Sequence, residues 1–92
     1  MPIAVTANQD LSRYEIRVDG EVAGFTRFVP DGDSLVFPHT EIDAKFAGQG
    51  LAKTLIRAVL DDVRAQGRKV VALCPFVKSF IEKNPGYQDL LA

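Results

Sequence analysis

Apolar and polar residues alternate through the first half of the chain, and this pattern predicts antiparallel strands joined by tight turns. Residues 13–18 alternate, break at Asp19-Gly20 and resume over residues 21–29. Asp-Gly between two alternating runs is among the strongest short hairpin signals, because the turn needs residues that tolerate a positive φ. Residues 3–6 offer a further short strand in front of this hairpin.

A second turn and a third strand follow the hairpin. Pro30-Asp31-Gly32-Asp33 combines residue types that favour a turn, and the pattern over residues 34–42 predicts a strand. Pro38 lies inside that strand and has no N–H to donate, so we expect an irregularity or an unpaired position there.

The second half of the chain changes to helical periodicity. A long helix is predicted by one apolar stripe that repeats every three or four residues, formed by Leu51, Leu55, Ile56, Val59, Leu60 and Val63. Gly67 supplies the C-terminal stop of this helix. Residues 69–74 form a continuous apolar run, which predicts a strand buried on both faces. Pro75 begins a short amphipathic helix that ends near Asn84-Pro85-Gly86, and residues 87–91 can add one more turn.

These elements together predict an α+β fold. Its mixed sheet would combine an antiparallel meander with a parallel strand pair, packed against one long helix and a short C-terminal helix. The long helix should cross over right-handedly and bring the strand at Val70 parallel to the strand that ends near Ile42. With 92 residues, 47% of them hydrophobic, we expect a single domain over residues 1–92.

Charge and composition exclude several classes of function. A formal net charge of −1 without a basic run argues against nucleic acid or an anionic membrane as the main partner. The first ten residues do not resemble a signal peptide, and no apolar run is long enough to span a bilayer. One cysteine and one histidine cannot form an internal disulfide or a structural zinc site. We therefore expect a reduced, cytoplasmic protein without a metal, monomeric or weakly dimeric.

A candidate binding site for an anion lies in the loop before the long helix, Gly48-Gln49-Gly50-Leu51-Ala52. Glycine lets a ligand approach the backbone closely, and the first N–H groups of the helix then point at that ligand, as in phosphate sites. A P-loop would need glycine at Ala47 and Ala52, and a dinucleotide fingerprint would need glycine at Lys53. Both are excluded, which leaves another kind of anion loop or a glycine-rich turn that only starts a helix.

The element order and this loop resemble the GNAT superfamily of acetyl-CoA-dependent N-acetyltransferases. The family signature [RQ]-x-x-G-x-[GA] matches at Gly50-Leu51-Ala52, whereas Ala47 replaces the usual Arg or Gln. Residues 39–42 and 73–87 are similar to the short, single-domain subgroup called YjdJ-type or NATD1-like acetyltransferases. Compared with the wider superfamily, the two early helices and the last strands, which usually form the acceptor site, are missing.

The resemblance implies a site for acetyl-CoA. The backbone amides that would hold the pyrophosphate are those of Gly48, Gln49, Gly50, Leu51 and Ala52. Lys53 could reach a phosphate of the cofactor. The backbone around Ile42 would bond the pantetheine arm and polarise the thioester carbonyl.

The usual proton donor of the family is absent from this sequence. Many GNAT enzymes use a tyrosine in the last helix, and the aligned position here is Ile81. Cys74 is the candidate substitute, because a helix that begins at Pro75 would favour its thiolate, and it could act as an acid or as a nucleophile. The alternative is a small buried core residue. Tyr87 is a weaker rival.

His39 and Glu41 are candidate bases for the acceptor amine. Alternation places them on one face of the third strand, and either could take a proton through a water, although a structural role is the alternative. The sequence therefore predicts an acetyl-CoA-binding N-acetyltransferase acting on an unidentified amine, with a protein or peptide as one option. The alternatives are a CoA or acyl-CoA binding module with little or no turnover, and a structural domain without a CoA site.

Overall fold

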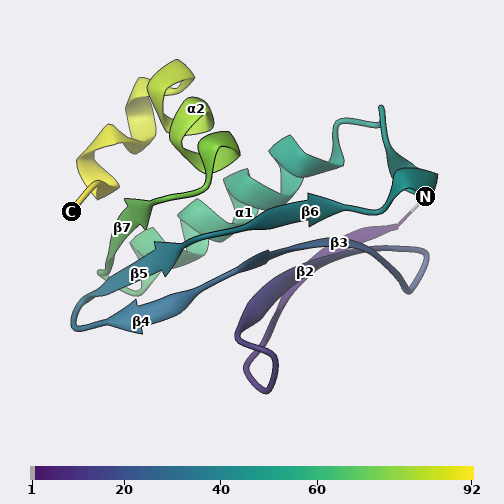
Figure 1. Ribbon diagram of the computed structural model, residues 1–92, viewed down its shortest axis with the longest axis horizontal. Coiled ribbons are helices and arrows are strands. Elements are labelled where there is room, and N and C mark those ends of the chain that lie inside the picture. Colours follow the sequence, from purple (N-terminus) through teal and green to yellow (C-terminus); the bar gives the residue numbers. More distant parts are fainter. Residues whose placement is uncertain (1) are drawn as a thin grey trace.

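The computed structural model describes residues 2–92, and its first strands form an antiparallel sheet. The sheet order is β1 (Ile3–Asn8), β2 (Arg13–Val18), β3 (Glu21–Arg27) and β6 (Thr40–Ile42) (Figure 1). The predicted hairpin is confirmed, because Val18 pairs with Glu21 and both Asp19 and Gly20 have positive φ, 51° and 84°. Its second strand, expected over residues 21–29, ends at Arg27, and Val29 belongs to a strand of another sheet. The short strand expected over residues 3–6 is also present and extends to Asn8.

A second sheet contains β4 (Val29–Asp31), β5 (Ser34–Phe37) and β7 (Lys69–Ala72), in that order. The turn expected over residues 30–33 is shorter than predicted: residues 30 and 31 belong to β4, and only Gly32-Asp33 turn the chain. The predicted parallel pair is confirmed, because β5 runs parallel to β7 with Leu35 opposite Val70.

The strand predicted over residues 34–42 is divided in two. β5 ends at Phe37 and β6 begins at Thr40, with Pro38 and His39 between them, so the irregularity expected at Pro38 is confirmed. β5 pairs with β7, whereas β6 pairs with β3. The two halves of this segment therefore belong to different sheets, and β6 and β7 do not pair.

The helices are α1 (Leu51–Ala65) and α2 (Pro75–Lys83), with short 3-10 helices η1 (Ala44–Phe46) and η2 (Pro85–Leu90). α1 lies behind the strands in Figure 1, and its predicted apolar stripe is buried against them. Arg64 on α1 bonds both carboxylate oxygens of Asp89, at 2.7 and 3.0 Å, and so fastens η2 to the long helix. η1 has no counterpart in the sequence-based expectation. No helix among the described residues is long and apolar enough to cross a membrane.

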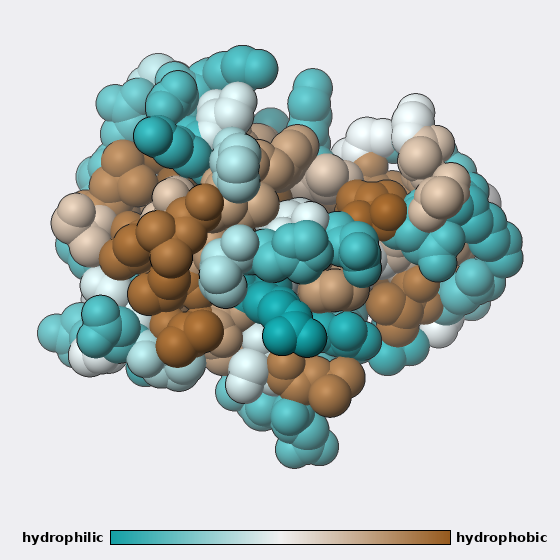
Figure 2. All heavy atoms as spheres, viewed as in Figure 1, coloured by the Kyte–Doolittle hydropathy of each residue, from teal (hydrophilic) through white to brown (hydrophobic). Residues whose placement is uncertain are grey.

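β7 is shorter and less buried than predicted, because it ends at Ala72 and not at Cys74. Val70 is buried against the core, but Lys69 is exposed, residues 71 and 72 are half-buried, and Leu73 is 63% exposed. The reason is its position at the end of the second sheet, where none of the described elements covers the face opposite α1. Figure 2 shows hydrophobic residues gathered on this face around β4, β5 and β7.

The outer edge of β7 is partly covered by the segment that follows η2. Leu91 forms a parallel bridge with Val70. The N–H of Ala92 donates to the Val70 carbonyl at 2.9 Å. Residues 91 and 92 therefore behave as a very short additional strand beside β7.

Candidate functional site

The loop between η1 and α1 has the backbone geometry of an anion site. Gly48 and Gly50 have φ values of 81° and 72°, in the left-handed region that glycine adopts without strain. Helical bonding begins where the Thr54 N–H donates to the Gly50 carbonyl at 3.4 Å. The N–H groups of the three preceding residues, 51–53, thus have no acceptor within the helix. Residues 48–50 and 53 are exposed, Ala52 is half-buried and Leu51 is buried, so the start of the helix is open to solvent on its loop side.

A basic groove lies next to this loop, between α1 and α2. It encloses about 300 Å³ and is lined by Lys53, Arg57, Phe76, Ser79, Phe80, Lys83 and Asn84. The Arg57 guanidinium carbon lies 6.0 Å from the centre of the Phe80 ring. A second hollow, lined in part by Gly50 and Lys53, continues the groove to the glycine loop. Three positive side chains and an aromatic wall therefore adjoin the loop donors.

Of the three cations in this groove, only Lys53 is predicted as a site residue from the sequence. Arg57 could have been found, because it lies one helical turn after Lys53 on the polar face of α1. Lys83 could not, since its place in the groove depends on how α2 packs beside α1.

β6 has one edge that no other strand of the described chain occupies. Arg27 N–H donates to the His39 carbonyl, and Asp43 N–H donates to the Ala23 carbonyl at 2.8 Å. In an antiparallel pair such bonds come from alternate residues, so the backbone groups of Thr40 and Ile42 face away from β3. Within residues 2–92, β6 pairs with β3 alone. Ile42, predicted to contact the cofactor arm, therefore lies on an open strand edge.

Cys74 lies beside that open edge. It directly precedes α2 and is 6% exposed, and its N–H donates to the Phe37 carbonyl at 2.8 Å. Its Sγ lies 3.4 Å from Thr40 Oγ1, which is 2.8 Å from Thr26 Oγ1. The thiol lies between the end of β7 and the start of α2, and it contacts a residue of the first sheet.

The surroundings of Cys74 favour its ionised form. Desolvation by burial raises the pKa of the thiol, but hydrogen bonds from the Thr40 hydroxyl and from the backbone N–H groups of residues 77, 76 and 40 outweigh it and lower that pKa below its ordinary value. Two of these N–H groups belong to the first turn of α2, where the helix dipole also favours a negative charge.

His39 and Glu41 are exposed on the other face of this segment. His39 Nε2 lies 3.9 Å from Glu41 Oε1, with side chains 55% and 61% exposed. Alternation along β6 places the Glu41 side chain opposite that of Thr40, the partner of Cys74. The structure therefore brings Cys74 together with Thr40 and brings His39 together with Glu41, as two separate pairs. Within residues 2–92, no group of three or more His, Cys, Asp or Glu side chains could hold a metal ion.

The position that aligns with the usual proton donor is part of the core. Ile81 is 1% exposed on the inner face of α2. Tyr87 donates its hydroxyl to Asp61 at 2.8 Å, and its ring centre lies 5.9 Å from that of Phe80. Burial, the hydrogen bond to Asp61 and the charge of Asp61 raise the pKa of Tyr87. Tyr87 is thus held by α1, where it fastens η2.

Comparison with known proteins agrees with this architecture. A family model described as GCN5-related N-acetyl-transferase matches residues 13–90. Protein NATD1 of Gallus gallus is 34% identical over 86 residues, covering 91% of this chain and 78% of the relative, and Protein NATD1 of Mus musculus is 27% identical over the same shares.

Solved structures share the fold. A GCN5-like protein of Staphylococcus aureus, determined by NMR, superimposes with a TM-score of 0.74 at 24% identity, covering 97% of this chain and 87% of that one. The ribosomal-protein-S18-alanine N-acetyltransferase of Escherichia coli gives a TM-score of 0.65 at 16% identity, and the match covers 77% of this chain but 49% of the enzyme. The loop signature, the divided strand and these matches lead to one conclusion: the chain belongs to the GCN5-related N-acetyltransferase (GNAT) family, as a short, NATD1-like member.

Proposed function

We propose that residues 1–92 form one minimal acetyltransferase domain that binds acetyl-CoA and transfers its acetyl group to an amine. The observation that carries this proposal is the open edge of β6, which runs between the glycine loop and the Cys74 thiol. Family and fold support acetyltransferase activity in general. We infer the cofactor from the loop at residues 48–53 and the acceptor from His39 and Glu41.

The residues present fit the chemical parts of acetyl-CoA. The N–H groups of residues 48–53 would hold the pyrophosphate, and Lys53, Arg57 and Lys83 would supply positive charge near its phosphates. The Thr40 carbonyl and the backbone groups of Ile42, which face away from β3, would hold the amide-containing arm in the manner of an added strand. Ala47 stands where the family usually has Arg or Gln, so one side-chain contact is lost while the backbone donors remain.

Acetyl-CoA, when bound, supplies an acetyl thioester that an amine can attack. The protein's part is to orient that group along β6, to accept the proton of the amine, and to return a proton to the departing sulfur. His39 and Glu41 are the candidate acceptors of the amine proton. Cys74 holds a proton on Sγ beside Thr40, and its lowered pKa suits either proton donation or, once ionised, nucleophilic attack.

Binding is tested by titrating the purified protein with acetyl-CoA while following backbone amide chemical shifts. We expect shifts at residues 48–53 and their loss in Gly50→Glu, which adds bulk and negative charge to the loop. Gly50→Ala is the matched control, because it carries the same strain at φ 72° without the charge. Equal acetyl-CoA affinity in Gly50→Glu and the wild type would contradict the loop assignment.

Turnover separates an enzyme from a binding module. The buried Ile81 at the usual acid position favours the binding module as second candidate, since it leaves Cys74 as the main proton donor near the open edge. We expect Cys74→Ala to keep its acetyl-CoA affinity while amine acetylation falls at least about tenfold, or about 1.4 kcal/mol of transition-state stabilisation. Unchanged turnover would return Cys74 to a packing role. Absence of turnover by the wild type over a broad amine panel would favour the binding module.

A further inference from the structure

The second sheet has an apolar patch on its face away from α1. Three valines lie beside one another across its strands, because Val29 pairs with Val36 and Val36 pairs with Val71. Val29 is 53% exposed, and the other two are half-buried. Leu73 lies two residues after Val71, on the same face by alternation, and is 63% exposed. These four residues form the apolar patch, and Figure 2 shows hydrophobic residues gathered over the same strands.

A row of polar side chains borders the apolar patch. Asp31 pairs with Ser34 and Ser34 pairs with Lys69, so these three side chains share the face of the patch. A carboxylate therefore lies at the β4 end of the row and an ammonium at the β7 end. Within residues 2–92, Asp31 forms no ion pair. The Lys69 ammonium donates one N–H to the Asp89 carbonyl at 2.8 Å, which leaves two further N–H groups.

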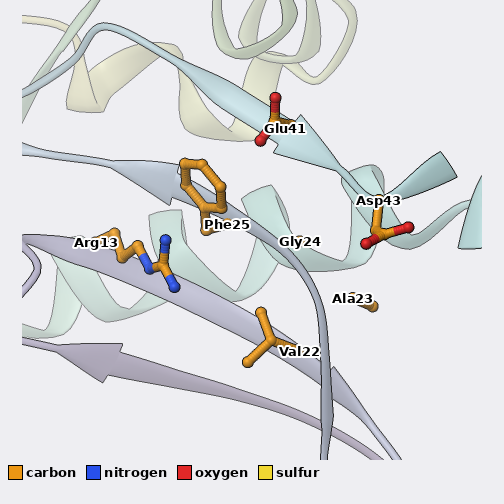
Figure 3. Close-up of a pocket in the computed structure, with 7 residues that line it drawn as sticks. All are labelled: Arg13, Val22, Ala23, Gly24, Phe25, Glu41 and Asp43. Carbon is orange, nitrogen blue, oxygen red and sulfur yellow. The ribbon is translucent and has the colours of Figure 1, made fainter.

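The first sheet carries charged side chains on its face away from α1. Arg13, Glu41 and Asp43 border a hollow there (Figure 3), beside a bulge at Ala23 where the register between β2 and β3 shifts. Arg13 is also bound to Glu15, at 2.8 Å. A partner that covered this face would remove water from these charges, which costs free energy. An apolar partner surface therefore fits the second sheet and not the first.

The apolar patch and its polar row are complementary to a second copy of the chain. When two copies pack face to face about a two-fold axis parallel to β5, the axis exchanges the positions of β4 and β7. Val29 then faces Val71 of the second copy, and Val36 faces its own equivalent. Asp31 faces Lys69 of the second copy and Lys69 faces its Asp31, so each charge gains a partner of opposite sign. A two-fold axis across the strands would instead bring the polar row over apolar residues.

We propose that the chain forms a two-fold dimer through this face of the second sheet. The dimer covers the apolar patch and forms two equivalent ion pairs between Asp31 and Lys69. Three strands about 4.8 Å apart and about 15 Å long cover only about 200 Å² of sheet. Because a stable interface buries about 800 Å² per partner, the dimer is weak, and we expect it at about 0.1–1 mM protein.

The test measures self-association of the purified protein without a ligand. Sedimentation equilibrium should show an average mass that rises with concentration, and the backbone amide shifts that change on dilution should lie in residues 29–36 and 69–73. Asp31→Lys brings positive charges together across the interface, and Lys69→Asp brings negative charges together. Each reversal alters two ion pairs, each worth up to about fivefold in affinity, so either variant alone should associate at least about tenfold more weakly.

A mixture of the two single variants tests the symmetry directly. In a dimer of Asp31→Lys with Lys69→Asp, both positive side chains of one chain face both negative side chains of the other. Mixing should therefore restore association to the wild-type level, which a folding defect in either variant would not allow. Glu82→Lys, the same change of charge on α2, is the matched control and should associate as the wild type does.

Four outcomes would overturn the proposed dimer. These are the absence of a dimer in the expected concentration range, dilution shifts confined to other residues, undiminished association of the single variants, and a mixture that associates as weakly as its components. Because the measurement uses no acetyl-CoA, its result does not depend on cofactor binding or on turnover.

Discussion

Replacing Gly24 with alanine is expected to push β6 away from β3. A Cβ atom at Gly24 would lie 2.6 Å from the Glu41 carbonyl oxygen and 2.5 Å from Ile42 Cδ1. Ordinary contacts begin at 3.4 Å, so the Glu41 oxygen must retreat by the difference, about 0.8 Å. The Ile42 side chain can rotate, but the carbonyl belongs to the backbone and can move only with its strand.

Two measurable effects follow from that displacement. Overpacking of this kind costs about 1–3 kcal/mol, and each kcal/mol lowers the melting temperature of so small a protein by about 4–8 °C. β6 also carries Thr40, whose Oγ1 lies 3.4 Å from Cys74 Sγ. A shifted β6 weakens that contact, so the pKa of Cys74 should rise in the same variant.

Urea unfolding followed by circular dichroism measures the first effect, and ultraviolet absorbance of the thiolate against pH measures the second, with Cys74→Ala as the blank. Gly86→Ala is the matched control, because Gly86 has no positive φ and its added Cβ would meet nothing within 4 Å. Its stability should change by less than about 1 kcal/mol. Wild-type stability and an unchanged thiol titration in Gly24→Ala would refute the close approach of β3 and β6.

Three further predictions concern single side chains. Thr40→Val should raise the pH at which the Cys74 thiolate forms, because it removes a hydroxyl hydrogen bond that lowers this pKa; an unchanged absorbance titration would refute it. Glu15→Gln should destabilise the fold by about 1.5–3 kcal/mol in urea unfolding at neutral pH, since Glu15 accepts charged hydrogen bonds. Desolvation raises the pKa of Glu15, but its hydrogen bonds from two arginines and Asn8 outweigh this and lower it, so its stabilisation is complete above the unfolded-state pKa of about 4.3 and is lost as pH falls below it. The acid loss of stability should therefore be smaller in Glu15→Gln than in the wild type. Ala47→Arg should strengthen acetyl-CoA binding modestly by calorimetry, and weaker binding would argue against a phosphate near this position.

Local signals predicted most of the fold. The hairpin depends on Asp19-Gly20, the break between β5 and β6 on Pro38, and the long helix on its own apolar periodicity. The prediction that β7 is buried on both faces was wrong, because an apolar run does not show which elements will cover the strand. Leu73, which follows β7, is exposed because β7 is the last strand of the second sheet. That position depends on how all the strands are arranged.

The candidate site was predictable only where it is contiguous in sequence. The loop at Gly48–Gly50 could be recognised from its spacing, and its positive φ values follow from the glycines. The contact between Cys74 and Thr40 joins residues 34 positions apart and depends on how the two sheets diverge. The bulge in β3 could have been expected from Gly24, an isolated glycine inside a strand pattern, but its place opposite Ile16 and Arg17 could not.

The short segment beside β7 has a consequence for how the protein behaves at high concentration. An uncovered strand edge with apolar neighbours is a template for pairing with another molecule, which leads to aggregation. On β4 this hazard is reduced by Pro30, which has no N–H to offer a new strand. On β7 the same protection comes from Leu91 and Ala92, which occupy the backbone groups of Val70. Leu91 and Ala92 thus block part of this edge, and we expect their removal to increase aggregation.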